Sequence, residues 1–83
     1  MAYSVYVLRS ETSGRLYIGQ TNDIERRFAE HQRGKHPSTR NRGPWQMIFQ
    51  IEFKSRTEAV ALERKLKSMK RPDRILAYLR KLV

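Results

Sequence analysis

The stretch RLYIGQTNDIERRFAEHQRG, residues 15–34, decides the fold, because it holds a strand, a turn and a helix in direct succession. Its first five residues are largely apolar and predict a short strand that ends at Gly19. The TND segment then supplies a helix start, in which Asn22 can cap the helix and Glu25 completes a capping-box-like arrangement. The helix is expected over about 23–33, and the glycine that follows provides a stop signal.

A second strand is predicted just before this stretch. YSVYVL, residues 3–8, is rich in β-branched and aromatic residues, and the ETSG connection has turn chemistry, so the two strands form a hairpin. A four-residue loop sets Tyr6 opposite Gly19, which leaves space for a small cleft. The same register sets Leu8 opposite Tyr17. The two tyrosines then share one face of the sheet, whereas a slip of one residue would separate them.

The rest of the chain predicts one more strand and two helices. WQMIFQIEF, residues 45–53, has alternating apolar positions, so one face is apolar and the other mixed. The apolar face is expected to carry Met47, Phe49, Ile51 and Phe53. SRTE is a capping box that opens a helix over about 55–70, and Pro72 separates it from a closing amphipathic helix. The expected inward positions of the two helices are Ala59, Leu62, Leu66 and Met69, then Ile75, Leu76, Leu79 and Leu82.

The order ββαβαα predicts an α+β fold, a small three-stranded antiparallel sheet flanked by helices. Eighty-three residues fit a single domain, here residues 1–83. The chain has no cysteine, which excludes thiolate zinc sites, iron–sulfur clusters and disulfides and fits a cytoplasmic location. No apolar run approaches the length of a membrane span, and no signal peptide is expected from the N-terminal residues.

Charge is the most informative bulk property. Eighteen Lys and Arg against eight Asp and Glu give a net charge of +10. A surplus of this size favours a polyanionic partner, and nucleic acid is the leading one. Two alternatives stay open: a basic protein whose charge only aids solubility, and binding to a membrane surface through the C-terminal amphipathic segment.

Helical geometry distinguishes the two neighbouring arginines of the first helix. Ile24 and Phe28 define its buried stripe, at about 100° per residue. Arg27 falls about 60° from Ile24, at the edge of that stripe, and His31 about 20° to the same side, whereas Arg26 points to solvent. A guanidinium at the edge can bind a phosphate with two hydrogen bonds. The plainer alternative is an arginine stem that covers the sheet edge beside a partly buried histidine.

Glu63 lies at the boundary of the buried face on the second helix. It can form an ordinary i,i+4 pair with Lys67. It can also serve as a ligand for Mg²⁺, which often binds through only one or two protein carboxylates.

The combination of these segments resembles the GIY-YIG nuclease superfamily, and most closely its small stand-alone bacterial members. The resemblance rests on SVYVL, LYIG, DIERRFAEH and a glutamate on a later helix, and it spans about residues 3–70. The YIG half is intact at residues 17–19, whereas the GIY half keeps only its tyrosine. By this resemblance, the site residues are the motif tyrosines Tyr6 and Tyr17, the helix residues Arg27 and His31, and the metal-binding Glu63.

The resemblance implies hydrolysis of DNA phosphodiester bonds by water, with Mg²⁺ or Mn²⁺ on Glu63 and no small-molecule cofactor. Arg27 would clamp the phosphate, and His31 would assist proton transfer. A tyrosine whose pKa is lowered by Arg27 and the metal would accept a proton from water, with Tyr6 and Tyr17 both open for this role.

Two departures from the family pattern bear on activity. Gln20 stands where some members carry a lysine, and no asparagine follows Asn41, although others have a late asparagine in the site. The main prediction is a metal-dependent endonuclease acting on DNA, with RNA left open. Its rival is a nucleic-acid-binding module of the same fold with little or no cleavage. A third hypothesis is an interaction or dimerisation module built on the C-terminal helix.

Basic residues near the first helix are expected to contact the backbone of the substrate strand. They are Arg33, Lys35, His36, Arg40 and Arg42. Such contacts are independent of base sequence and sensitive to salt. The chain has no separate DNA-reading module, so structure-selective or non-specific cleavage is expected. The oligomeric state does not follow from the sequence.

Overall fold

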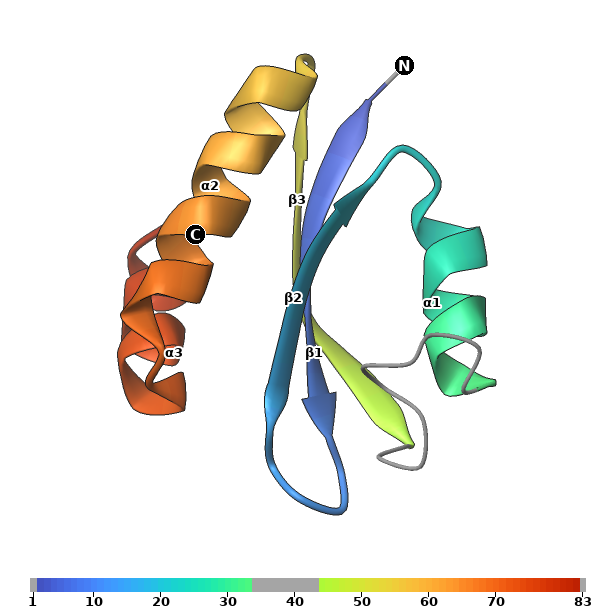
Figure 1. The fold of residues 1–83 in the computed structure, drawn as a ribbon, viewed down its shortest axis with the longest axis vertical. Coiled ribbons are helices and arrows are strands. Elements are labelled where there is room, and N and C mark those ends of the chain that lie inside the picture. The colour runs from blue at the N-terminus through green and yellow to red at the C-terminus, as the bar shows by residue number, and fades with distance from the viewer. Residues whose placement is uncertain (1, 34–43, 83) are drawn as a thin grey trace.

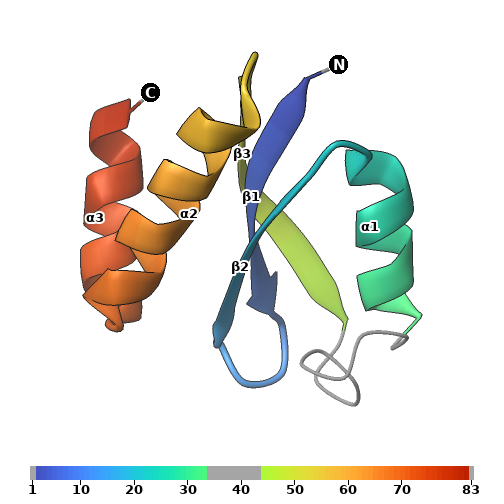
Figure 2. The same cartoon turned by 45° about the horizontal axis from the view of Figure 1, so that its top comes forward.

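The computed structural model describes residues 2–33 and 44–82 and contains the predicted elements in the order ββαβαα. They are β1 (Tyr3–Ser10), β2 (Leu16–Thr21), α1 (Ile24–Gln32), β3 (Trp45–Phe53), α2 (Arg56–Met69) and α3 (Pro72–Leu82). The three strands form one antiparallel sheet in the order β2-β1-β3. Helix α1 covers one face of this sheet, and α2 and α3 cover the other (Figures 1 and 2). The predicted α+β fold is therefore confirmed.

The hairpin has the predicted register. Tyr6 pairs with Gly19 and Leu8 pairs with Tyr17, and the backbone N–H of Ser10 donates to the carbonyl of Arg15 at 2.9 Å. Both strands continue past their predicted ends, β1 to Ser10 and β2 to Thr21. This longer ladder fixes the direction of the side chains on both faces, because successive residues of a strand alternate.

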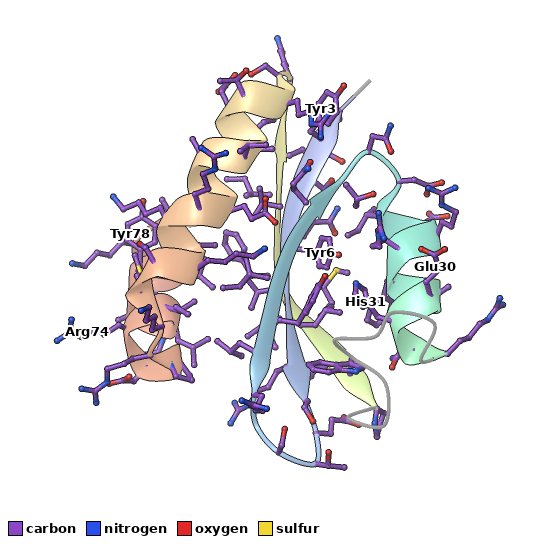
Figure 3. The ribbon with its side chains drawn as sticks, viewed as in Figure 1. Tyr3, Tyr6, Glu30, His31, Arg74 and Tyr78 are labelled. Atoms are coloured by element: carbon purple, nitrogen blue, oxygen red, sulfur yellow. The ribbon has the colours of Figure 1, made fainter. Side chains whose placement is uncertain are left out.

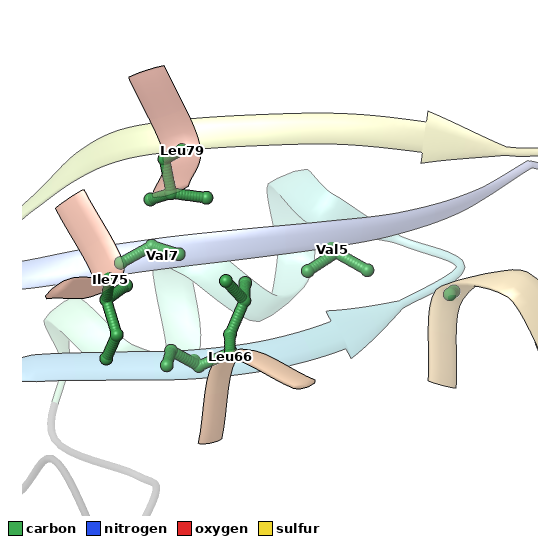
Figure 4. Close-up of a cluster of buried hydrophobic side chains, with 7 residues drawn as sticks. Val5, Val7, Leu66, Ile75 and Leu79 are labelled. Atoms are coloured by element: carbon green, nitrogen blue, oxygen red, sulfur yellow. The ribbon is translucent and has the colours of Figure 1, made fainter. Parts of the chain in front are cut away.

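The two faces of β1 belong to two different cores. Val5 and Val7 pack against α2 and α3, in a cluster that includes Leu66, Ile75 and Leu79 (Figure 4). Tyr6 and Leu8 point the other way and pack with Trp45; Tyr17, Ile24, Phe28 and Met47 join them from the surrounding elements. The candidate site residues of the hairpin are therefore on the α1 side of the sheet.

The predicted apolar face of β3 is wrong at one position. Phe49 pairs with Val7, but Met47 pairs with Leu8, so the register shifts between these pairs and Ile48 is the extra residue of a β-bulge. Phe49 and Ile51 pack on the α2 and α3 side, whereas Met47 packs on the α1 side with Tyr6 and Leu8. A bulge reverses the alternation beyond it, which a strict period of two does not anticipate.

The helix ends agree with the sequence in part. Ser55 caps α2 as predicted, since its hydroxyl accepts from the N–H of Glu58 at 3.3 Å. The cap of α1 is Asp23 rather than Asn22, because its carboxylate accepts from the N–H of Arg26 at 3.2 Å. Leu82, expected in the inward stripe of α3, is exposed near the end of that helix. No helix in residues 2–33 and 44–82 has the length and apolar character to cross a membrane.

Candidate active site

Tyr6 and His31 form a buried pair between the sheet and α1. The Tyr6 hydroxyl and Nε2 of His31 are 3.0 Å apart and share a hydrogen bond, and each residue is only 1% exposed. Tyr6 comes from the central strand and His31 from the last turn of α1 (Figure 3). The histidine is therefore fully buried, more deeply than the partly buried helix histidine of the plainer alternative.

Tyr17 completes an aromatic cluster with these two residues. Its ring centroid is 4.5 Å from that of His31 and 6.3 Å from that of Tyr6. A Cβ placed on Gly19 would come within 2.6 Å of the Tyr6 hydroxyl oxygen. Only glycine leaves room for the Tyr6 ring at this point, so the ring fills the space that the sequence predicts as a small cleft.

The two arginines of α1 differ as predicted. The side chain of Arg26 is 65% exposed and lies near Asp23, whereas that of Arg27 is 35% exposed and is 3.8 Å from Glu30. Burial raises the pKa of both Tyr6 and Tyr17, and the charge of Arg27 opposes this rise, so its guanidinium acts on the aromatic cluster. A pair at 3.8 Å with a half-exposed carboxylate is weak and leaves the guanidinium able to engage a phosphate.

Glu63 approaches the same cluster from α2. Its negative charge raises the pKa of both tyrosines, so the cluster lies within the fields of Arg27 and Glu63 together. The side chain of Glu63 is 18% exposed, and one carboxylate oxygen is 3.0 Å from Nζ of Lys67. Of the five site residues expected from the sequence, Tyr6, Tyr17 and His31 are therefore in contact, whereas Arg27 and Glu63 act on them through their charges.

The donor set around Glu63 fits a weakly held divalent cation. Within residues 2–33 and 44–82, no group of three or more His, Asp or Glu side chains is arranged to hold a metal ion. Glu63 alone offers a hard oxygen ligand, and Lys67 competes for that carboxylate. Mg²⁺ tolerates such a site, because it can complete its shell with water and phosphate oxygens.

The expectation of a lowered tyrosine pKa is wrong for the protein by itself. Burial raises the pKa of Tyr6 far above its ordinary value, and the neighbouring Tyr17 adds to this rise. Burial also raises the pKa of Tyr17, although Lys67 and Arg27 oppose it. Desolvation of the charged form outweighs the nearby cations, so both hydroxyls are neutral at physiological pH.

The predicted backbone-contacting residues fall mostly outside the described part of the chain. Lys35, His36, Arg40 and Arg42 lie in residues 34–43, so their contacts with nucleic acid remain a prediction. Arg33 is exposed at the C-terminal cap of α1.

A groove beside Tyr17 contains residues that the sequence analysis did not select. It has a volume of about 530 Å³ and lies between the start of β2, the end of α2 and the start of α3. Arg15 and Lys70 line it together with Lys67. Lys70 is also the C-cap of α2 with φ of 60°, a left-handed conformation that favours glycine or asparagine. A lysine at this helix end, where glycine or asparagine is usual, is the sequence signal that could have identified Lys70.

Comparisons with known proteins give the family of this chain. The model of the GIY-YIG catalytic domain matches residues 2–75. A UPF0213 protein of Cupriavidus pinatubonensis is 42% identical over 65 residues, which are 77% of this chain and 72% of that protein. A UPF0213 protein of Oceanobacillus iheyensis is 35% identical over 72 residues, or 86% and 83% of the two chains.

A solved structure extends the comparison to three dimensions. The solution NMR structure of a UPF0213 protein from Bacillus halodurans is similar with a TM-score of 0.59 and 33% sequence identity. The similarity covers 94% of this chain and 83% of that one. Family model, relatives and fold agree with the intact YIG motif, and this chain belongs to the GIY-YIG nuclease family.

Proposed function

We propose that the protein is a metal-dependent endonuclease that hydrolyses DNA phosphodiester bonds in the cytoplasm. Its cleavage is structure-selective or non-specific. The observation that carries the proposal is the aromatic cluster of Tyr6, Tyr17 and His31, which lies within the fields of Arg27 and Glu63. Hydrolysis of a phosphodiester needs a phosphate clamp, a group that handles the proton of the attacking water and stabilisation of the leaving oxygen. The cluster and the two charged residues that act on it offer one candidate for each task.

Arg27 is the candidate phosphate clamp. A planar guanidinium can donate two parallel hydrogen bonds to phosphate oxygens, and its charge stabilises the extra negative charge of the transition state. The partial exposure of Arg27 and its long contact with Glu30 support this role. Arg26 lacks both the position at the cluster and the electrostatic effect on the tyrosines.

Tyr17 is the better candidate of the two tyrosines for contact with the attacking water. Its side chain is half-buried and lines an open groove, whereas Tyr6 is almost fully buried. Tyr6 and His31 share a hydrogen bond next to the Tyr17 ring. This pair would position the ring and receive the proton that leaves Tyr17. A neutral tyrosine is a poor base, so Tyr17 must lose its own proton before it can accept one from water. Arg27 must therefore neutralise the anionic phosphate, and Lys67, which is close to Tyr17, must help to stabilise the phenolate.

Glu63 is the residue that would hold the divalent cation, Mg²⁺ or Mn²⁺. When bound, such a cation neutralises charge that develops on the leaving oxygen. Lys67 would have to move away from Glu63 for the carboxylate to serve as a ligand.

The test is cleavage of single-stranded, branched and duplex DNA by the purified protein, with and without Mg²⁺ or Mn²⁺. Arg27→Ala and Glu63→Gln are each expected to lower the cleavage rate about 10²- to 10³-fold. Arg26→Ala, the neighbouring arginine on the solvent side, is the matched control and should leave the rate nearly unchanged. Cleavage that survives both site substitutions would come from a contaminating nuclease and would contradict the proposal.

Two observations favour a second function, a nucleic-acid-binding module of the same fold. The pKa of both tyrosines is raised rather than lowered, and Lys67 already occupies the carboxylate of Glu63. The glutamine at position 20 adds to this argument, because some family members carry a lysine there. Binding of every DNA substrate without cleavage, with either metal present, would favour the module over the enzyme.

A further inference from the structure

The groove beside Tyr17 is lined by both basic and apolar side chains. Arg15 before β2 and Lys67 and Lys70 at the end of α2 supply three positive charges, and no acidic residue of the described part of the chain lines the groove. Leu16, Pro72 and Ile75 supply apolar surface between them. This pairing of charge and apolar area suits a ligand with an anionic group attached to a flat, weakly polar ring.

The size of the groove matches a single small ligand rather than a duplex. Its volume of about 530 Å³ falls within the range of about 300–1,000 Å³ that is typical of small-molecule sites. A nucleotide has the required chemistry, since its phosphate can meet the basic side chains and its base the apolar ones. A base enters such a site only when it is unpaired, because a paired base stays in the stack.

Lys70 gives independent support for a ligand. As the left-handed C-cap of α2 it has φ of 60°, which costs about 1–2 kcal/mol for a residue with a side chain. Glycine would remove this strain, but it would also remove one of the three positive charges that line the groove. Backbone strain that persists beside a candidate site is a sign that the side chain has a role there.

We propose that this groove binds one unpaired nucleotide of the substrate strand, next to the phosphate that is cleaved. The proposal rests on the proposed function, because it assigns the groove to the same nucleic acid. Tyr17 connects the two sites, since it lines the groove and packs against His31. Lys67 also connects them, since it lines the groove and pairs with Glu63. The groove therefore selects strands with an unpaired base beside the cleavage point.

The first test uses thymidine 5′-monophosphate, thymidine and inorganic phosphate as probes of the full chain in two-dimensional NMR. The nucleotide is expected to shift the backbone amide signals of Leu16, Ile18 and Ile75 at millimolar concentration, and to do so more strongly than either fragment. Equal shifts with inorganic phosphate would overturn the proposal, because the base would then contribute nothing. Nucleotide shifts confined to other parts of the chain would overturn it as well.

The second test uses Lys70→Gly and binding of a single-stranded oligonucleotide, measured by fluorescence anisotropy in the presence of EDTA. The variant should unfold at a temperature a few degrees higher and bind the oligonucleotide about three- to tenfold more weakly. Lys54→Gly, an exposed lysine outside the groove and without a left-handed backbone, is the matched control and should show neither effect. A purely structural role of Lys70 predicts higher stability with unchanged binding and would overturn the proposal.

These results separate the inference from the proposed function. If the protein binds the nucleotide in the groove but cleaves no DNA, the groove proposal stands and the endonuclease proposal fails. If the protein cleaves DNA but shows no nucleotide shifts, and Lys70→Gly leaves oligonucleotide binding unchanged, the endonuclease proposal stands and the groove proposal fails.

Discussion

Gly19 lies directly opposite Tyr6 in the β1–β2 ladder, and a Cβ at this glycine would be 2.6 Å from the Tyr6 hydroxyl oxygen and 2.7 Å from the carbon that bears it. Tyr6 is held on its other side by the hydrogen bond to His31. The ring therefore occupies the volume that a side chain at position 19 would need. The glycine of the YIG motif is a spatial requirement of the site.

Gly19→Ala should displace the Tyr6 ring and lower the free energy of unfolding by about 1–3 kcal/mol, as overpacking of a well-filled site does. The shift should also alter the ring proton signals of His31 in NMR spectra. Gly14→Ala is the control, because Gly14 has φ of 75° and a Cβ there would meet Nη2 of Arg9 at 4.0 Å, an ordinary van der Waals contact. Gly14→Ala should cost stability through backbone strain and leave the His31 signals in place. Unchanged His31 signals in Gly19→Ala would contradict the predicted clash.

The stability of the protein should fall as the pH rises above 10. The pKa of Tyr6 and of Tyr17 is raised above the ordinary value of 10.0, so the native state keeps protons that the unfolded state releases. The stabilisation is complete below pH 10 and is lost as the pH rises toward the folded-state pKa, by about 1.4 kcal/mol per pH unit for each tyrosine. Urea unfolding at a series of pH values measures this slope.

Tyr6→Phe should reduce that slope, since it removes the more strongly shifted group. It should also lower stability at neutral pH by about 1–3 kcal/mol, because Nε2 of His31 loses its buried partner. Tyr78→Phe, which removes a hydroxyl on α3, is the matched control. An identical pH slope in Tyr6→Phe and in the unaltered protein would refute the pKa argument.

Much of this architecture could be predicted because local signals agreed with each other. The S-x-x-E box fixed the start of α2, and the ETSG turn fixed the register that brings Tyr6 opposite Gly19. The bulge at Ile48 could not be predicted, because it depends on how β3 accommodates the sheet and leaves no composition signal. The tyrosine pKa was misjudged for a similar reason. Nearby cations can be inferred from helical spacing, whereas burial depends on the tertiary packing of α1 against the sheet.

Gln32 should contribute more stability than its place at the end of α1 suggests. Its side-chain amide donates to the carbonyl of Trp45 and its oxygen accepts from the Trp45 N–H, both at 2.8 Å. These two hydrogen bonds join the end of α1 to the start of β3. Gln32→Ala should therefore lower the free energy of unfolding by about 1–2 kcal/mol, as measured by urea unfolding. Gln32→Glu should not restore this stability, because it keeps the acceptor for the Trp45 N–H but sets a carboxylate oxygen against the Trp45 carbonyl. Gln50→Ala, an exposed glutamine on β3, should have almost no effect, and an equal loss in both alanine variants would contradict the prediction.

Lys67→Met should raise the affinity of the protein for Mn²⁺. Nζ of Lys67 is 3.0 Å from the Glu63 carboxylate, so a cation that binds Glu63 must displace it. Partly exposed ion pairs are worth about 0.2–1 kcal/mol, which predicts an increase of up to about fivefold in calorimetric titrations. Lys54→Met is the control for the loss of one positive charge elsewhere, and Glu63→Gln should abolish binding. An unchanged affinity in Lys67→Met, with binding still lost in Glu63→Gln, would mean that Lys67 and the metal use different oxygens of the carboxylate. Binding that survives Glu63→Gln would instead remove Glu63 as the metal ligand and, with it, the metal-dependent form of the proposed reaction.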